Sequence, residues 1–447
     1  MQRLTSVLAE DQQRRVAGAL AAMGCGVGDR VALLLPRKVE AISAILGALR
    51  SGVIPVVLNS GLLPHERDEL LADAEPAATV AGDAGLAALL AGSPRELASA
   101  PLGRPMQYTS GTTGRPKGVW TGVLSEADAA ALVDEERDAW GFAADDVNLI
   151  CSPLHHSAPI RFAAGTLLAG GDVVLLDAFD VAMFGRAVRE HRPTTAFMVP
   201  THLQRVLHDP RSDRRSGRTH PDLSSFRLVA HAGAPCPEPL KRAAMDAFPA
   251  GAVWEFYGST EGQFTVCSPD EWLDRPGTVG RARPGRTLST DDDGVIWCDV
   301  PARWRWSYWR DPARTAAAWR GSAFSVGDVG RLDDEGYLYL DGRRDDLIIS
   351  GGVNVYPLEV EHVIARYPGV EDVAVFPVAD DDWGQRVCAA VVGDVDLAAL
   401  DAWLRGEVAP FKRPKSLVAV DDLPRTSTGK VRRSSLAADL GIPSSRD

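Results

Sequence analysis

Short apolar runs alternate with amphipathic stretches along most of the chain. The apolar runs, rich in β-branched residues, predict strands at Val31–Leu35, Val53–Leu58, Val147–Cys151, Asp172–Leu176, Thr194–Val199, Leu228–His231 and Val253–Tyr257. Helix-like segments lie between them, at Val39–Leu49, Pro159–Leu168, Met183–Glu190 and Pro239–Ala247. Such alternation is typical of β-α crossover units with parallel strands. The handedness of these crossovers favours an α/β fold built of layered sheets and helices.

The pattern changes after Trp272, where turns rich in Gly, Asp and Arg separate shorter strands such as Val295–Val300 and Gly336–Leu340. This predicts a small β-rich subdomain. Mixed α/β patterning then resumes after Arg343-Arg344-Asp345-Asp346, over a length sufficient for another compact domain. We therefore predict a large N-terminal domain, residues 1–344, and a small α+β C-terminal domain, residues 345–447.

Composition is that of a folded globular protein, with 45% hydrophobic and 24% charged residues in 447. That length is more than one ordinary core accommodates. The 60 acidic and 48 basic residues give a net charge of −12 and form no long basic block. This argues against a nucleic-acid partner, so any nucleotide must be held by a local site of backbone N–H groups and a few cations.

The six cysteines are far apart and form no C-x-x-C pair, which indicates neither a zinc site nor a disulfide framework. They fit a reducing compartment, so we expect a cytoplasmic location. The N-terminal stretch is charged and helical in pattern and lacks the apolar segment of a signal peptide. No apolar run approaches the roughly 20 residues that span a bilayer, so no membrane span is expected. The sequence does not indicate an oligomeric state.

The stretch from Tyr108 to Gly118, YTSGTTGRPKG, combines glycines, hydroxyl residues and a lysine. Its glycines permit unusual backbone conformations, its hydroxyls can surround phosphate oxygens, and the lysine adds a cation. The spacing is not that of a Walker A loop, and clusters of this composition also form ordinary loops. The order S-G-T-T-G-x-P-K-G resembles the phosphate loop of the adenylate-forming (ANL) superfamily, which includes acyl-CoA synthetases, luciferases and peptide-synthetase adenylation domains. The resemblance implies an ATP-phosphate site at Thr109, Ser110, Gly111, Thr112, Thr113, Gly114 and Lys117.

Further motifs follow in the order of that superfamily, over nearly the whole chain. His156, in Pro-Leu-His-His-Ser, resembles the residue that gates the acid pocket, although an isolated histidine is usually structural. The segment His231-Ala-Gly-Ala-Pro resembles the stretch that lies along adenine, which implies nucleotide contacts for Gly233, Ala234 and Pro235. An ordinary strand end would contain the same small residues.

The segment Trp254–Glu261 corresponds to the motif Y-G-x-T-E. The resemblance implies that Tyr257, followed by Gly258, stacks on adenine, that Thr260 contacts the α-phosphate, and that Glu261 holds Mg²⁺. Downstream, Phe-Ser-Val-Gly-Asp328 resembles the segment whose aspartate receives both ribose hydroxyls. Ser325 replaces the more common threonine, and an aspartate beside a glycine also fits a tight turn.

The segment from Gly342 to Glu359 resembles the crossover between the two domains. Arg343 would approach the ribose and phosphate, Asp345 falls at the hinge, and Gly351 and Gly352 would leave room for the pantetheine arm of coenzyme A. Glycine pairs also mark ordinary turns. Near the C-terminus, the motif TSTGK carries the family's lysine, here Lys430, which would bring an ammonium group to the carboxylate and α-phosphate.

The resemblance implies that a carboxylic acid is activated by ATP and Mg²⁺ to an acyl-AMP, and then transferred to coenzyme A after the mobile C-terminal domain rotates. Alternatives remain: a carrier protein or an amine as acceptor, an unusual oxyanion as substrate, or a nucleotide-binding module without catalysis. The acid pocket is expected at Ser157–Phe162, Val199–Thr201, His231–Ala234 and Gly262–Val266. Arg161 is its one evident cation, which favours a monocarboxylic fatty, aromatic or polycyclic acid.

Overall fold

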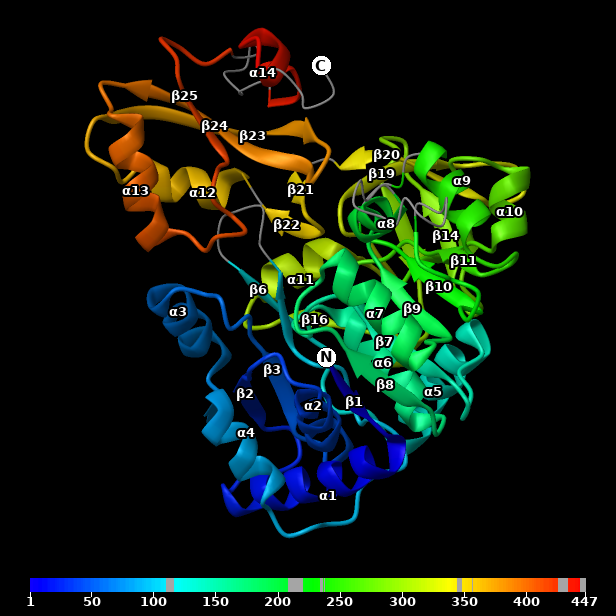
Figure 1. The fold of residues 1–447 in the computed structure, drawn as a ribbon. Helices are drawn as coiled ribbons and strands as arrows, with labels where there is room; N and C mark the ends of the chain where they lie inside the picture. Colours follow the sequence, from blue (N-terminus) through cyan, green and yellow to red (C-terminus); the bar gives the residue numbers. More distant parts are fainter. Residues whose placement is uncertain are drawn as a thin grey trace. The chain divides into compact units, whose positions relative to one another are not determined.

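A computed structural model shows two compact units (Figure 1). It describes residues 1–109, 116–207, 220–233, 236, 238–343, 348–355, 357–424 and 433–442. The first unit contains Met1–Ser60, Leu71–Tyr108 and Gly118–Gly342, and the second contains Gly61–Leu70, Thr109–Lys117 and Arg343–Asp447. The domain boundary predicted between residues 344 and 345 lies outside the described residues and stays a prediction.

A six-stranded sheet forms the largest layer of the first unit, in the order β1-β8-β7-β9-β10-β11. Its strands are β1 (Gln2–Leu4), β7 (Val147–Ile150), β8 (Asp172–Leu175), β9 (Thr195–Met198), β10 (Leu228–His231) and β11 (Val253–Glu255). All pair in parallel except β1, which lies antiparallel to β8 at the edge. The connecting helices are α5 (Glu126–Trp140), α6 (Ser157–Leu168), α7 (Val181–His191), α8 (Pro200–Leu207) and α9 (Glu238–Ala247). The central strands are almost entirely buried, as expected for parallel strands covered by helices.

A second, three-stranded parallel sheet has the order β3-β2-β4. It is formed by β2 (Arg30–Leu34), β3 (Ile54–Val57) and β4 (Ala78–Ala81), with helices α1 (Ser6–Ala22), α2 (Glu40–Arg50) and α4 (Gly82–Leu90). Helix α3 (Pro64–Ala74) follows β3 in the chain, and its residues up to Leu70 belong to the second unit. Helix α2 is apolar on nearly every face, and it packs against α1, α6 and β3. This helix therefore links the two sheets of the first unit, and it supplies part of the cavity described below.

The β-rich part consists of short strands and turns, as the sequence predicted. A three-stranded sheet contains β5 (Gln107–Thr109), β6 (Lys117–Trp120) and β16 (Ser307–Tyr308), and a four-stranded sheet contains β14 (Thr287–Thr290), β15 (Ile296–Asp299), β17 (Trp319–Arg320) and β18 (Ala323–Phe324). Two further pairs are β12 (Thr265–Val266) with β13 (Arg281–Ala282), and β19 (Asp328–Leu332) with β20 (Leu338–Arg343). Helices α10 (Pro269–Asp274) and α11 (Pro312–Ala318) and a 3₁₀ turn at Ala302–Trp304 connect them. Buried aromatic rings, among them Trp306 and Phe324, form the core of this part.

The second unit has its own sheet and core. The sheet is formed by β21 (Ile348–Ser350), β22 (Val353–Val355), β23 (Val370–Asp380), β24 (Gly384–Gly393) and β25 (Ser416–Ala419). Helices α12 (Pro357–Ile364), α13 (Leu397–Glu407) and α14 (Arg433–Asp439) accompany it. The hairpin of β23 and β24 buries alternate residues in two clusters, one around Val375 and one around Phe376. In the described part of the chain, no helix is long and apolar enough to cross a membrane.

The α/β class, the β-rich subdomain and the α+β C-terminal unit agree with the sequence prediction. Predicted strands and helices of the parallel layers lie within a few residues of the observed ones. The prediction missed β1, which has only three residues, and most of the two-residue strands of the β-rich part. Elements this short show no periodicity, and they form through pairing with segments distant in the sequence, as β1 does with β8 and β12 with β13.

Candidate active site

A tight turn between β11 and β12 carries Thr260 and Glu261. Gly258 and Gln263 form an antiparallel bridge, and the Ser259 amide donates to the carbonyl of Gly262 at 2.8 Å. A Cβ at residue 258 would lie 2.9 Å from that carbonyl oxygen. At residue 262 a Cβ would lie 2.6 Å from the ring of Phe324, which is itself buried. Close approach therefore requires glycine on both sides of the turn.

Glu261 is buried and oriented by two neighbours. Its Oε1 accepts a hydrogen bond from the Tyr308 hydroxyl at 2.9 Å, and its backbone carbonyl accepts from both terminal nitrogens of Arg104 at 3.2 Å. Burial lowers the pKa of Arg104 to about 10, against the attraction of Glu261, so Arg104 remains a cation at neutral pH. The residues fit a magnesium ion brought by ATP, because Mg²⁺ is commonly bound through one carboxylate and the phosphates of the substrate. The described residues contain no cluster of three or more His, Cys, Asp or Glu side chains that could hold a metal ion.

Tyr257 and Asp328 form a buried pair. The Tyr257 hydroxyl donates to Asp328 Oδ2 at 2.5 Å, although the two residues are 71 positions apart. Both side chains are less than one-tenth exposed. A carboxylate accepts several hydrogen bonds, so Asp328 has the chemistry to receive a vicinal diol as well. The two motifs that the sequence associated with adenine and ribose are thus in direct contact.

His156 precedes α6, and its ring lies 4.3 Å from the ring of His155. Burial lowers the pKa of His156 to about 4. Burial, with repulsion from His156 and Arg37, lowers the pKa of His155 to about 2. Both imidazoles are therefore neutral at pH 7, and His156 can shape or gate a pocket but supplies no charge to a carboxylate.

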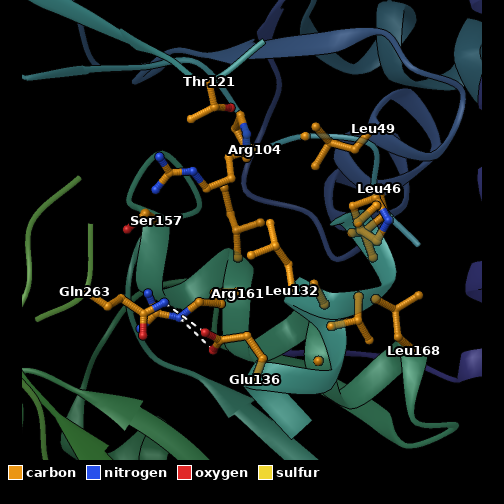
Figure 2. A pocket seen from close by; sticks show the side chains of 18 of the residues that line it. Leu46, Leu49, Arg104, Thr121, Leu132, Glu136, Ser157, Arg161, Leu168 and Gln263 are labelled. Atoms are coloured by element: carbon orange, nitrogen blue, oxygen red, sulfur yellow. Dashed lines mark hydrogen bonds and ion pairs between the residues drawn. The ribbon is translucent and has the colours of Figure 1, made fainter. Parts of the chain in front are cut away.

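A cavity of about 170 Å³ adjoins the turn (Figure 2). Ser259, Thr260, Gly262 and Gln263 line it, together with Ser157 at the start of α6. Its apolar wall, hereafter the leucine wall, consists of Leu46 and Leu49 of α2, Leu132 of α5 and Leu168 of α6. The turn that carries the predicted phosphate and metal residues therefore also forms one side of an apolar cavity.

Glu136 of α5 is the centre of a buried polar cluster at the edge of this cavity. It accepts hydrogen bonds from Trp140 Nε1 at 3.1 Å and Gln263 Nε2 at 2.9 Å, and it forms ion pairs with Arg161 Nε at 3.2 Å and Arg283 Nη1 at 3.0 Å. Burial favours the neutral carboxyl, but the two arginines and the two hydrogen bonds outweigh it and hold the pKa of Glu136 below its usual value. Glu136 is therefore ionised, and its negative charge compensates the positive charges of Arg161 and Arg283.

The predicted site residues are only partly described. Ser110, Gly111, Thr112, Thr113, Gly114, Ala234, Pro235, Asp345 and Lys430 lie outside the described residues, as does the side chain of Arg343, the last residue of β20. Thr109 ends β5 and Lys117 begins the neighbouring strand β6. Gly233 follows β10 with φ of +90°, and Gly351 and Gly352 form the turn between β21 and β22 with φ of +58° and +78°. Within the first unit, the structure brings Tyr257 to Asp328 and places Gly258, Thr260 and Glu261 on one turn.

Sequence reasoning missed Arg104, Glu136, Arg283 and Tyr308. Arg104 lies in a connector, Glu136 in α5, Arg283 directly after the short strand β13, and Tyr308 in the short strand β16. None of them belongs to a motif that the sequence analysis identified. Of the expected pocket segments, Ser157–Phe162 and Gly262–Val266 contribute to the cavity, but Val199–Thr201 and the described part of His231–Ala234 do not line it. Helices α2 and α5 and residues 101–107 line it instead.

Comparisons with known proteins agree with these features. The model of the AMP-binding enzyme family matches residues 2–101 and 105–294, and the AMP-binding enzyme C-terminal domain matches residues 359–430. The feruloyl-CoA synthase of an Amycolatopsis species is 35% identical, over 96% of this chain and 92% of that protein. The amide bond synthetase McbA from Marinactinospora thermotolerans has a TM-score of 0.85 at 30% identity, over 98% of this chain and 95% of that one. The o-succinylbenzoate CoA synthetase MenE from Bacillus subtilis has a TM-score of 0.83 at 27% identity, over 97% of this chain and 93% of that one.

The family matches fall in both units, the first match includes Tyr257 and Glu261, and the feruloyl-CoA synthase matches over nearly its full length. The chain therefore belongs to the AMP-binding enzyme family, that is, to the adenylate-forming enzymes, with acid-CoA ligases among its homologues.

Proposed function

We propose that this protein is an AMP-forming acid-CoA ligase, which activates a carboxylic acid as its acyl-AMP and transfers the acyl group to coenzyme A. The observation that carries the proposal is the position of the turn at residues 258–263. One turn presents Thr260 and Glu261 and also lines the cavity. An acid in that cavity would therefore have its carboxylate beside the residues proposed to contact the α-phosphate. Family membership and the acid-CoA ligases among the relatives support the same reaction class.

In the first half-reaction, a carboxylate oxygen attacks the α-phosphorus of ATP and pyrophosphate leaves. Such a reaction depends on alignment and on neutralising charge rather than on a protein nucleophile. The leucine wall holds the body of the acid, and Arg104 supplies a cation beside Glu261. Glu261, held by Tyr308, would bind Mg²⁺, which when bound offsets phosphate charge. Asp328 and Tyr257 would hold the ribose and adenine, and Lys430 would bridge the carboxylate and the phosphate.

In the second half-reaction, the thiol of coenzyme A attacks the acyl carbonyl and AMP leaves. We propose that the second unit turns at Asp345, withdraws Lys430 and presents the turn at Gly351 and Gly352 to the pantetheine arm. The positive φ values of both glycines support this assignment, since larger residues at these positions would be strained and would also narrow a channel.

The test is a pyrophosphate-release screen over carboxylic acids, with and without coenzyme A, comparing wild type with Lys430→Ala. We expect AMP, pyrophosphate and an acyl-CoA from wild type. The variant should lose at least about 100-fold in acyl-AMP formation, as for removal of one charge-stabilising group, but should convert supplied acyl-AMP to thioester. Failure of every acid to yield an AMP-linked product would refute the proposal.

A second acceptor deserves the same assay, because the similar structure McbA is an amide bond synthetase. An amine could attack the acyl-AMP in place of a thiol. Replacing coenzyme A by primary amines in the screen separates the two cases. Faster amide than thioester formation at equal concentration would assign the chain to amide synthesis.

A further inference from the structure

The cavity has one strongly polar side, which the proposed chemistry at Thr260 and Glu261 does not use. We define the polar side as Gln263, Arg161 and Glu136, which Figure 2 shows next to one another, away from Leu46, Leu49 and Leu168. All three line the cavity. Burying a polar group costs free energy unless the group is hydrogen-bonded, so polar groups in an otherwise apolar cavity require a physical reason.

The orientation of the Gln263 amide follows from its partner. Nε2 lies 2.9 Å from Glu136 Oε1, and a carboxylate only accepts hydrogen bonds, so the amide must donate there. The other amide atom, Oε1, is therefore an acceptor. It is buried and receives no hydrogen bond from any described residue. By fixing the amide in this orientation, Glu136 leaves Gln263 with an unsatisfied acceptor on a side chain that is 3% exposed.

Arg161 contributes the complementary donor. Its Nε pairs with Glu136, and its guanidinium lies over the ring of Phe256 at 5.0 Å. Nη2 is buried and donates no hydrogen bond within the described part of the chain. Among the described residues, the polar side therefore has a buried acceptor, Gln263 Oε1, and a buried donor, Arg161 Nη2, that form neither a hydrogen bond nor an ion pair, whereas Arg161 Nε forms only the ion pair with Glu136.

We propose that the acid carries a hydroxyl group on an apolar body, and that this hydroxyl donates to Gln263 Oε1 and accepts from Arg161 Nη2. This inference rests on the proposed acid-ligase function and names its substrate class. A second carboxylate would satisfy Arg161 but would face Gln263 Oε1 and the negative Glu136. An ammonium group would satisfy Gln263 but would be repelled by Arg161. A hydroxyl group both donates and accepts, so it fits both partners.

The dimensions indicate a compact acid with one ring. A cavity of about 150 Å³ is sufficient for benzene, and this one measures about 170 Å³. Gln263 follows Thr260 by three residues on the same turn, and both residues line the cavity. The ring would then lie between the reacting carboxylate near Thr260 and the hydroxyl at Gln263, with the ring edge against the leucine wall.

Matched acids provide the test. Benzoate and cinnamate are each compared with their 4-hydroxy and 4-carboxy derivatives, by kcat/KM for pyrophosphate release and, without ATP, by Kd from calorimetry with the intact chain. Wild type should prefer the hydroxy acid over its parent by about 10- to 100-fold, because the parent leaves both polar groups buried and unpaired. The 4-carboxy acids should be the poorest of each set.

Two variants and a control assign the preference. Gln263→Leu should reduce the hydroxy-to-parent ratio to below about 3-fold by raising activity on the parent acid, since the unpaired acceptor is gone. Arg161→Met should also reduce the hydroxy-to-parent ratio to below about 3-fold. If this variant does not fold, the result for Gln263→Leu is the deciding one. Glu126→Gln, at the exposed start of α5 and outside the cavity lining, is the control and should leave the ratio unchanged.

An unchanged ratio in folded Gln263→Leu, or a preference of wild type for the parent or dicarboxylic acids, would overturn the hydroxyl assignment. Absence of pyrophosphate release with every acid would instead refute the proposed function. In that case the calorimetric ratios still decide whether the cavity selects a hydroxyl group.

Discussion

Replacing Glu136 by leucine should destabilise the first unit more than any comparable change on α5. The side chain neutralises Arg161 and Arg283, and Arg283 is only 1% exposed. Removing one member of a buried ion pair typically costs about 3–5 kcal/mol, because the remaining charge stays buried without compensation. The hydrogen bonds from Trp140 and Gln263 are lost as well. We therefore expect a loss of free energy of unfolding at the upper end, about 5 kcal/mol.

Urea unfolding followed by tryptophan fluorescence measures this loss, since most of the 11 tryptophans belong to the first unit. Glu126→Gln, on the exposed first turn of the same helix, is the matched control and should change stability by less than about 0.5 kcal/mol. The double variant Glu136→Leu with Arg283→Met should recover at least about 1 kcal/mol, because it removes an unpaired charge. A loss below about 1 kcal/mol, or a double variant no more stable than the single one, would refute the account of the cluster.

Three further predictions concern protonation, the nucleotide site and the turn. Burial lowers the pKa of His202 to about 3 and that of His156 to about 4, whereas the unfolded chain takes up these protons near pH 6.5. Stability should therefore fall as pH drops below 6.5 toward 4, by about 1.4 kcal/mol per pH unit for each histidine, and urea midpoints that do not change between pH 7 and 5 would contradict this. Tyr257→Phe removes the hydrogen bond to Asp328 and should raise KM for ATP about 10-fold, with little change in KM for the acid. An unchanged KM for ATP would show that this hydrogen bond does not contribute to nucleotide binding. Gly262→Ala should displace the turn and lower kcat at least 10-fold, at a stability cost of about 1–3 kcal/mol, and wild-type kcat in the folded variant would show that the turn tolerates a side chain.

The apolar pattern determined the layered fold because long elements carry their own periodicity. The strand at Leu228–His231 was predicted to the residue, and the helix predicted at Pro239–Ala247 is observed at Glu238–Ala247. The strand is a short, fully buried and mostly apolar run, and the helix has one apolar face, so local sequence is sufficient for both. The order of the motifs also indicated the family from sequence alone, because the residue types and spacings around Tyr257, Glu261 and Asp328 can be read within short contiguous segments.

Only the tertiary structure decided which residues line the cavity proposed to bind the acid. Leu46 and Leu132 are apolar helix residues that the sequence assigns to a core, and they line a cavity because α2 and α5 both meet α6 there. Glu136 and Arg283 are 147 positions apart, and in the sequence each is an ordinary charged residue of a surface-like stretch. The stabilisation that this pair provides depends on its burial and on the 3.0 Å between Glu136 Oε1 and Arg283 Nη1. Both are set by the packing of helices and loops. A motif is local in the sequence and is shared by many chains, whereas the contacts in this cavity join segments that are far apart in the sequence and meet only in the folded structure.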